Sequence, residues 1–176
     1  MKHFYFILTL LSGIILVGCS SIDCSIEGRV MCHYAIQDKN GNDVQLAYPL
    51  TVTLQREATF GDTVFINNQG GVSTLDLPMS HVGESDEIRM SIGVTYTVVV
   101  DTIETQETEY ITDVVKIKKN NSPVFESIDC TPRFNHEITD VEFTRNFIDT
   151  LIINKANVTK DATSPNIIIR LRSSLD

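Results

Sequence analysis

The feature that most constrains the fold of this chain is a two-residue alternation of apolar and polar side chains, which recurs in many short segments. These segments are rich in Val, Ile, Thr and Tyr, and clusters of Gly, Pro, Asn and Asp separate them. Such segments form half-buried β-strands, because successive side chains of a strand point to opposite faces. The expected strands are residues 29–37, 50–55, 63–66, 72–77, 88–103, 108–118, 124–130 and 166–172, with two more in 136–153 that meet in a bend near Asn146.

Short strands with turn signals roughly every 8–12 residues, and no long helix, are typical of a β-sandwich or barrel. We expect an antiparallel, immunoglobulin-like sandwich with Greek-key connections. The alternative is a transthyretin-like sandwich or a small barrel. The apolar run at 166–172 predicts a strand that is central in its sheet or partly buried on both faces. We also expect a bend near Gly93, a polar reversal at 104–107 and a chain break at 120–123.

The first 18 residues, MKHFYFILTLLSGIILVG, have the composition of a secretory signal peptide. A single Lys precedes an apolar run that is shorter than the ~20 residues of a membrane-spanning helix. The run ends in LVG followed by Cys19, which resembles a bacterial lipobox. That resemblance implies cleavage before Cys19 and lipidation of Cys19. An uncleaved membrane anchor with a chance cysteine is the alternative.

The expected organisation is a lipoprotein signal peptide at 1–18, a lipid-anchored tether at 19–28 and a single β-sandwich domain at 29–176. Several acyl chains on Cys19 would anchor the protein stably, so the membrane is a predicted partner through this lipid. Ser20, rather than Asp, follows the lipid cysteine, which favours the outer membrane. We expect the domain to face the periplasm, and exposure at the cell surface is the alternative.

Three cysteines remain beside the lipid-bearing one, and an oxidising periplasm permits a disulfide. Cys32 falls on the apolar face of the strand expected at 29–37, where a thiol behaves as a small hydrophobic group. We therefore expect a Cys24–Cys130 disulfide, and Cys32–Cys130 is the alternative pairing. A zinc site is not indicated, because the chain lacks ligand spacings such as C-x₂-C or H-x₃-H.

Three segments near the C-terminus carry a family resemblance: residues 122–130 read SPVFESIDC, residues 136–154 contain HEI and FIDTLIIN, and residues 166–171 read NIIIRL. They are similar to the patterns P-x-F-x-S-x-D-C-G, H-K-I…I-D-S-I-x-I-x-N and N-I-K-I-Y-F of DUF6452, a family of Bacteroidetes lipoproteins. Residues 67–80, which end in LPMS, resemble its mid-chain LPL or LPM region. The resemblance implies a lipid-anchored all-β protein and no particular activity.

The chain departs from that family pattern at three places. Thr131 stands where the family often has Gly, and Cys32 is an additional cysteine. Residues 88–111 are longer than the usual hairpin of the family. These departures concern the number and length of strands more than membership of the family.

Composition and motifs exclude several classes of function. A net charge of −9 and a pI near 4.8 do not suit a nucleic-acid-binding protein, which needs a basic surface. Ser127, His136 and Asp140 contain the groups of a catalytic triad, but no G-x-S-x-G elbow accompanies them. We therefore expect that the protein is not an enzyme and has no catalytic residues.

Two acidic loops contain the oxygen ligands that a metal ion uses, but we expect turns at both. Residues 38–43 are rich in Asp and Asn, but Pro49 stands at the twelfth position, where an EF-hand needs a bidentate Glu. The Gly in this loop predicts a hairpin turn. Residues 84–87 are expected to form a solvated turn. We expect no metal ligands and no cofactor.

Three Asp-Thr-aliphatic triplets occur, at 62–64, 101–103 and 149–151. Each resembles the O-glycosylation acceptor of exported Bacteroidetes proteins, so Thr63, Thr102 and Thr150 are candidate modification sites. The same triplets are also ordinary strand composition.

All these features together favour a lipid-anchored envelope protein with a non-enzymatic binding or scaffolding role and an envelope protein as its partner. A periplasmic module that binds a small ligand or metal, and an envelope enzyme with an unrecognised site, are the alternatives.

Overall fold

The computed structural model describes residues 30–55, 61–125, 127, 130–160 and 163–172. The expected signal peptide and tether, with Cys19 and Cys24, lie outside these residues. The described part of the chain contains strands and no helix. The strands are β1 (Met31–Gln37), β2 (Leu50–Gln55), β3 (Thr63–Gln69), β4 (Thr74–Pro78), β5 (Ser85–Val100), β6 (Ile103–Val124), β7 (Arg133–Phe143), β8 (Ile148–Ile153), β9 (Asn157–Val158) and β10 (Ile167–Leu171).

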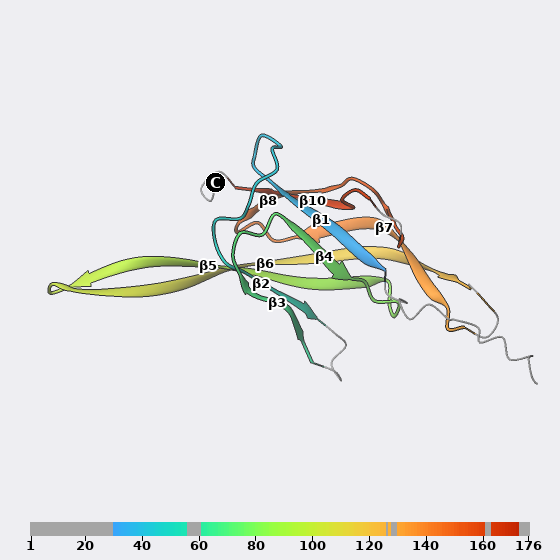
Figure 1. The fold of residues 1–176 in the computed structure, drawn as a ribbon, viewed down its shortest axis with the longest axis horizontal. Helices are drawn as coiled ribbons and strands as arrows, with labels where there is room; N and C mark the ends of the chain where they lie inside the picture. Colours follow the sequence, from blue (N-terminus) through green and yellow to red (C-terminus); the bar gives the residue numbers. More distant parts are fainter. Residues whose placement is uncertain (1–29, 56–60, 126, 128–129, 161–162, 173–176) are drawn as a thin grey trace, which may run out of the picture.

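These strands form two sheets (Figure 1). The smaller sheet has the strand order β4-β1-β10-β8, and the larger has the order β3-β2-β5-β6-β7-β9. Strands β1 and β10 run parallel to each other, and the other pairs of named strands are antiparallel. The expected all-β sandwich is confirmed, with this one parallel pair as an addition to the antiparallel pattern.

One hydrophobic core lies between the sheets and draws side chains from both. The alternation seen in the sequence sets which side chains enter it: Leu75 and Leu77 of β4 are buried and the residues between and before them are exposed. Strand β10 is flanked by β1 and β8, which confirms that the last strand is central. Burial of these apolar faces is the main stabilising contribution, at about 25 cal/mol per Å² of apolar surface.

The longest strands differ from the expectation at both of their ends. Strand β5 stops at Val100 and the chain reverses at Asp101 and Thr102, so the reversal expected at 104–107 is wrong by about three residues. Strand β6 runs through 120–123, where a break was expected. It continues because β7 pairs with it as far as Val124, and this pairing outweighs the local preference of Asn and Pro for turns.

The two strands expected within 136–153 are confirmed, as β7 and β8. The strand expected at 124–130 is wrong in its described part, since β6 ends at Val124 and β7 begins only at Arg133. In place of the loop expected after Ala156, the two-residue strand β9 adds to the outer edge of β7. Tertiary pairing, rather than local composition, decides each of these boundaries.

Candidate functional site

The most distinctive surface is a projecting hairpin formed by residues 94–110, which we call the hairpin arm. Strand β5 pairs with β2 only as far as Ile92, and β6 pairs with β7 only from Val115 onward. Between these points, among the described strands, β5 and β6 pair only with each other, and they extend beyond the other strands at the left of Figure 1. The seven cross-strand pairs from Val94–Glu109 to Val100–Ile103 correspond to a reach of about 23 Å at about 3.3 Å per residue.

A two-residue turn closes the arm. Asp101 and Thr102 have positive φ values of 50° and 76°, and Val100 and Ile103 form the last pair of the ladder. Two successive positive φ values are characteristic of a type I′ turn, whose twist matches that of the flanking strands. The hairpin is therefore regular to its end.

A buried carboxylate fixes the base of the arm. Asp113 has no exposed surface, and its oxygens accept four hydrogen bonds of 2.7–2.8 Å from Thr144 Oγ1 and from the backbone N–H groups of Asn146, Phe147 and Ile148. Asn146 Nδ2 also donates to Thr112 O at 2.6 Å. On the other strand, Gly93 N donates to Pro49 O at 3.1 Å. The arm thus leaves the body from a rigid point.

One face of the arm continues the core-facing side of β5. Side chains two residues apart share a face of a strand, so the buried Ile88, Met90 and Ile92 are followed on the same side by Val94, Tyr96, Val98 and Val100. Val94 and Val98 are half-buried, whereas Tyr96 is 45% exposed, Val100 is 60% exposed and Ile103, across the ladder, is 67% exposed. We call these residues, 94, 96, 98, 100 and 103, the inner row.

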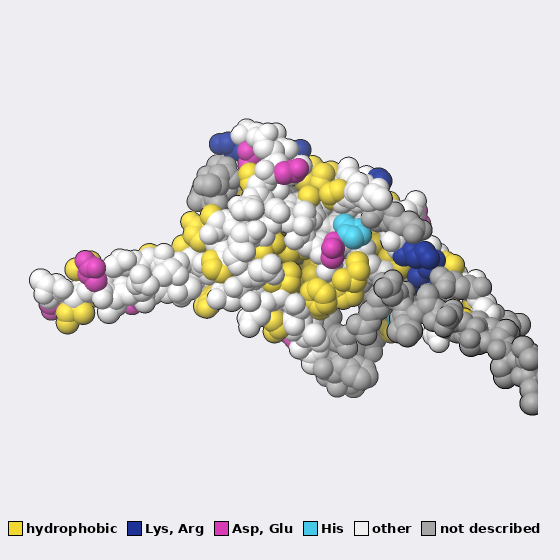
Figure 2. All heavy atoms as spheres, in the orientation of Figure 1, with side chains coloured by type: hydrophobic (Ala, Val, Ile, Leu, Met, Phe, Trp, Pro, Cys, Tyr) yellow, Lys and Arg dark blue, Asp and Glu magenta, His cyan; other side chains and the backbone are white. Residues whose placement is uncertain are grey.

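The arm is also acidic. Asp101, Glu104, Glu107 and Glu109 lie on it, and no Lys, Arg or His occurs from residue 94 to residue 112. In Figure 2 its free end carries hydrophobic and acidic side chains. Glu107 is the direct cross-strand partner of Tyr96, and Glu109 that of Val94. Apolar side chains of β5 and acidic side chains of β6 therefore run side by side on one face.

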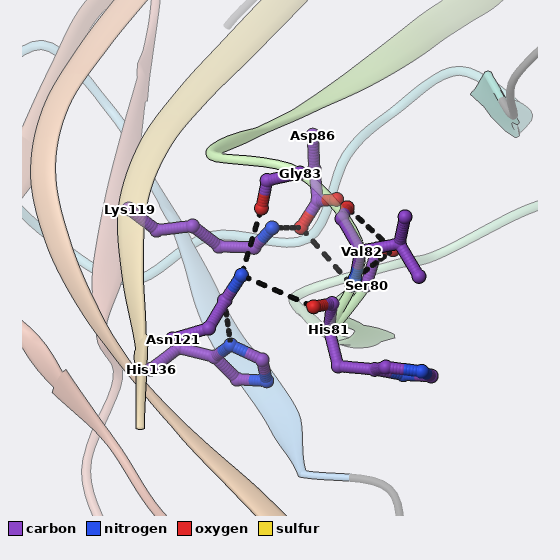
Figure 3. A network of polar contacts seen from close by, with 8 residues as sticks. All are labelled: Ser80, His81, Val82, Gly83, Asp86, Lys119, Asn121 and His136. Carbon is purple, nitrogen blue, oxygen red and sulfur yellow. Dashed lines mark hydrogen bonds and ion pairs between the residues drawn. The ribbon is translucent and has the colours of Figure 1, made fainter. Parts of the chain in front are cut away.

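A second notable feature is a buried polar cluster on the body (Figure 3). Lys119 Nζ, on a side chain with no exposed surface, lies 3.1 Å from Asp86 Oδ2, which also accepts a hydrogen bond of 3.2 Å from Ser80 N. Burial raises the pKa of Asp86, and the neighbouring Lys119 partly offsets this rise. The solvated turn expected at 84–87 is therefore wrong at Asp86, which lies in the cluster as the partner of Lys119.

The same cluster holds His136 and Asn121. Asn121 Nδ2 donates to His81 O and Gly83 O, at 3.3 and 2.7 Å, and its Oδ1 lies 2.7 Å from His136 Nδ1. Because that oxygen is an acceptor, His136 Nδ1 must carry the proton. Burial, with Lys119 and His81 nearby, lowers the pKa of His136 to about 4. The cluster therefore ties the loop before β5 to β6 and β7, with a neutral His136 at pH 7.

The structure does not assemble the triad that the sequence allows on paper. His136 is bound to Asn121, whereas Asp140 Oδ2 is bound to Lys118 Nζ at 3.0 Å. A different histidine, His33 of β1, pairs with Asp76 on the neighbouring strand β4. In the part of the chain that the structure describes, no three His, Cys, Asp or Glu side chains come together as a metal site.

The loop at 38–43 is the turn that the sequence predicts. Asp38 Oδ1 accepts hydrogen bonds from Asn40 N at 2.8 Å and from Asn42 N at 2.9 Å, and Gly41 has a φ of 89°. Hydrogen bonds to Asn42 and Asn40 lower the pKa of Asp38. The carboxylate thus serves the turn itself.

The cysteines and candidate glycosylation sites fall in different environments. Cys32 is a free, buried thiol, which confirms it as a core residue and rules out the Cys32–Cys130 pairing. Burial raises the pKa of the Cys32 thiol to about 12. Cys130 is disulfide-bonded, while the expected partner Cys24 lies outside the described residues. Thr63 and Thr102 are exposed, and Thr150 is half-buried.

Comparison with known protein families gives a match over most of the chain. A model described as a family of unknown function, DUF6452, matches residues 50–171, a range that includes the whole hairpin arm. No curated protein and no solved structure matches the chain. Among the residues that the structure describes, no helix is long and apolar enough to cross a membrane.

Proposed function

The chain belongs to the DUF6452 family, whose function is unknown, and we propose that it is a lipid-anchored envelope protein that binds another envelope protein through its hairpin arm. The role is binding or scaffolding rather than catalysis. The observation that carries the proposal is the inner row, an apolar face that continues the core-facing side of β5 and over which none of the described strands packs.

The physical argument starts from the stability of the arm. A two-stranded hairpin by itself is marginally stable in water, and usually needs a third strand or a packed layer. Val100 and Ile103 are 60% and 67% exposed at the end of the arm. Contiguous exposed apolar side chains mark protein interaction sites more often than scattered ones do. A partner that covered the inner row would act as the missing layer.

The anchoring half of the proposal rests on the sequence. Lipid on Cys19 would place the domain at the outer membrane, facing the periplasm, with the short tether holding it close to the lipid surface. A Cys24–Cys130 disulfide would then connect the tether to the body of the domain. Intact-mass analysis of the native protein tests both features, and also tests glycosylation at Thr63, Thr102 and Thr150.

Site-specific photo-crosslinking in intact cells tests the binding role. A photoreactive residue with a long, flexible side chain replaces Val99, which is 62% exposed near the end of the arm. Val99 lies on the face opposite the inner row, so the substitution leaves that row intact, and the long side chain can reach a partner around the edge of the narrow two-stranded arm. The control position is Val82, which is 54% exposed on a loop of the body. We expect Val99 to give one discrete crosslinked envelope protein that Val82 does not give, and tagging that protein should recover this chain.

The same crosslinked species at both positions would contradict the proposal, as would the absence of any species at Val99. A double variant, Val98→Thr with Val100→Thr, keeps β-branched side chains in the strands but removes apolar surface from the inner row. It should abolish the Val99 crosslink while the protein accumulates normally in cells. An unchanged crosslink would show that the inner row is not the binding face.

A further inference from the structure

We infer, resting on the proposed function, that the partner of the hairpin arm is a protein surface on which an apolar strip runs directly beside a row of Lys or Arg. The inference comes from the register of the arm. Tyr96 lies opposite Glu107 and Val94 lies opposite Glu109, so an apolar row and an acidic row share one face. Direct cross-strand neighbours have Cβ atoms about 4.5–5.5 Å apart, and the partner's two rows must match that spacing.

The acids of the arm differ from acids of the body in lacking a basic neighbour. On the body, Lys118 Nζ contacts both Asp140 and Glu142, and Lys119 contacts Asp86. Among the described residues, none of the four arm acids forms an ion pair. Four like charges on a narrow ribbon repel one another, and complementary cations on a partner would relieve this repulsion and steer association.

Two other occupants fit the arm less well. A second copy of this chain would bring its Glu107 and Glu109 against those of the first if the inner rows met face to face, and like charges at an interface are unfavourable. An anionic lipid surface would repel the arm for the same reason. In addition, Asp101 stands at the outermost turn, so a charged group would enter the membrane first.

Defined probes test this chemistry directly. The first probe is a designed β-hairpin peptide that carries a row of Val on one strand and a row of Lys on the other, on the same face. The matched probe has Glu in place of each Lys. Binding of the labelled probes to the full chain, purified in detergent, is measured by fluorescence anisotropy at low and at physiological salt.

We expect the Val/Lys probe to bind at least fivefold more tightly than the Val/Glu probe, and this preference to shrink as salt rises. Replacing Glu107→Gln and Glu109→Gln together should remove most of the preference. The control, Glu84→Gln with Glu137→Gln, also removes two negative charges, but from exposed positions of the body. It should leave the preference for the Val/Lys probe intact. This control separates a local site from general attraction to an acidic protein.

The outcomes distinguish this inference from the proposed function. If the Val99 crosslink forms but the two probes bind equally or not at all, the arm is a binding site and the inferred partner chemistry is wrong. Equal effects of the arm and body variants would also overturn the inference, as would arm-dependent self-association in sedimentation. If no Val99 crosslink forms, the proposed function itself fails.

Discussion

The two halves of the β5–β6 hairpin share the alternation of apolar and polar side chains along β5, but their environments are opposite. In the body, β2 flanks β5 and β7 flanks β6, and the core-facing side chains Ile88, Met90 and Ile92 are at most 2% exposed. In the arm, the same alternation continues through Tyr96 and Val100 without neighbouring strands. The comparison of body and arm shows that alternation predicts a strand and its two faces, whereas the topology of the sheet decides whether either face is covered.

The border between the halves is the most sensitive place to test this comparison. Asp113 lies there, fully buried and bound to four donors in the connection between β7 and β8. In Asp113→Ala those donors lose their acceptor, and three of them are backbone N–H groups. Because each unsatisfied buried donor is costly, we expect a loss of about 3–5 kcal/mol in the free energy of unfolding.

Urea denaturation measures this loss, with Asp101→Asn at the tip of the arm as the matched control. The control removes one charge at an exposed turn that tolerates Asn, and we expect a change within about 0.5 kcal/mol. A similar loss in both variants would mean that Asp113 does not act as the anchor of the arm. Asp113→Asn keeps one acceptor oxygen and should fall between the two.

Truncation of matched apolar residues compares the halves most directly. Ile92→Ala creates a cavity in the packed core, and we expect it to cost about 2–5 kcal/mol. Val100→Ala, on the same face of the same strand but 60% exposed, should cost less than about 1 kcal/mol. Thermal and urea unfolding check both values. A loss above 2 kcal/mol for Val100→Ala would show that the inner row is already covered in the isolated protein.

Much of this architecture can be predicted from the sequence. The strands with clean alternation and flanking turn residues, such as 50–55 and the central 166–172, lie close to where the pattern puts them. The arm could not be predicted, because its inner row has the composition of a core strand. The unusual length of 88–111 is the one signal for it.

The buried charges were also missed, although a signal for them exists. Asp113 and Lys119 fall on the inner side of β6, in step with the buried Val115 and Ile117. A charged residue on the apolar face of an alternating strand predicts a buried partner, because an unpaired charge is too costly there. The sequence does not identify the partners, because only tertiary folding brings Asp86 to Lys119 and residues 144–148 to Asp113.

Acid should weaken the body and leave the arm unchanged over a defined range of pH. The pKa of His136 falls from 6.5 to about 4 in the folded protein. Between these values the imidazole binds a proton in the unfolded chain but stays neutral in the folded chain. The resulting stability is complete above about pH 6.5 and is lost as the pH falls toward 4. At 1.36 kcal/mol per pKa unit, the loss is at most about 3 kcal/mol.

Unfolding in urea at pH 7 and pH 4.5 tests this effect, and His136→Gln should flatten the difference. Asp86, whose pKa is raised in the folded state, works in the opposite direction, because the folded chain takes up its proton first as the pH falls. If the free energy of unfolding still fell between pH 7 and pH 4.5 by the same amount in His136→Gln, the loss of stability in acid would not come from His136. The arm has no histidine, so its amide protection should stay constant between pH 7 and 5.5.

The smallest expected effect concerns the turn of the arm. Thr102 is β-branched and has a φ of 76°, a conformation that costs roughly 1–3 kcal/mol in a side chain of this kind. Thr102→Gly would give Asp-Gly, a preferred pair for a type I′ turn, and part of the gain is offset by the greater freedom of Gly in the unfolded chain. We expect a net stabilisation of about 1 kcal/mol, or about fivefold slower amide exchange across the arm.

Amide exchange within residues 94–100 and 103–109 is the suitable measurement, because opening of the arm need not involve the body. In the described part of the chain, the strands of the arm pair only with each other, so opening of the arm should depend directly on how well the turn closes. The control is Val64→Thr on β3, which is 56% exposed and lies in register with Thr53 and Arg89 at the body end of β5; it should leave arm exchange unchanged. Faster exchange in Thr102→Gly would mean that contacts of the Thr side chain, rather than the turn geometry, hold the tip. Slower exchange would show that the arm keeps its shape without help from the core, as a surface prepared for a partner must.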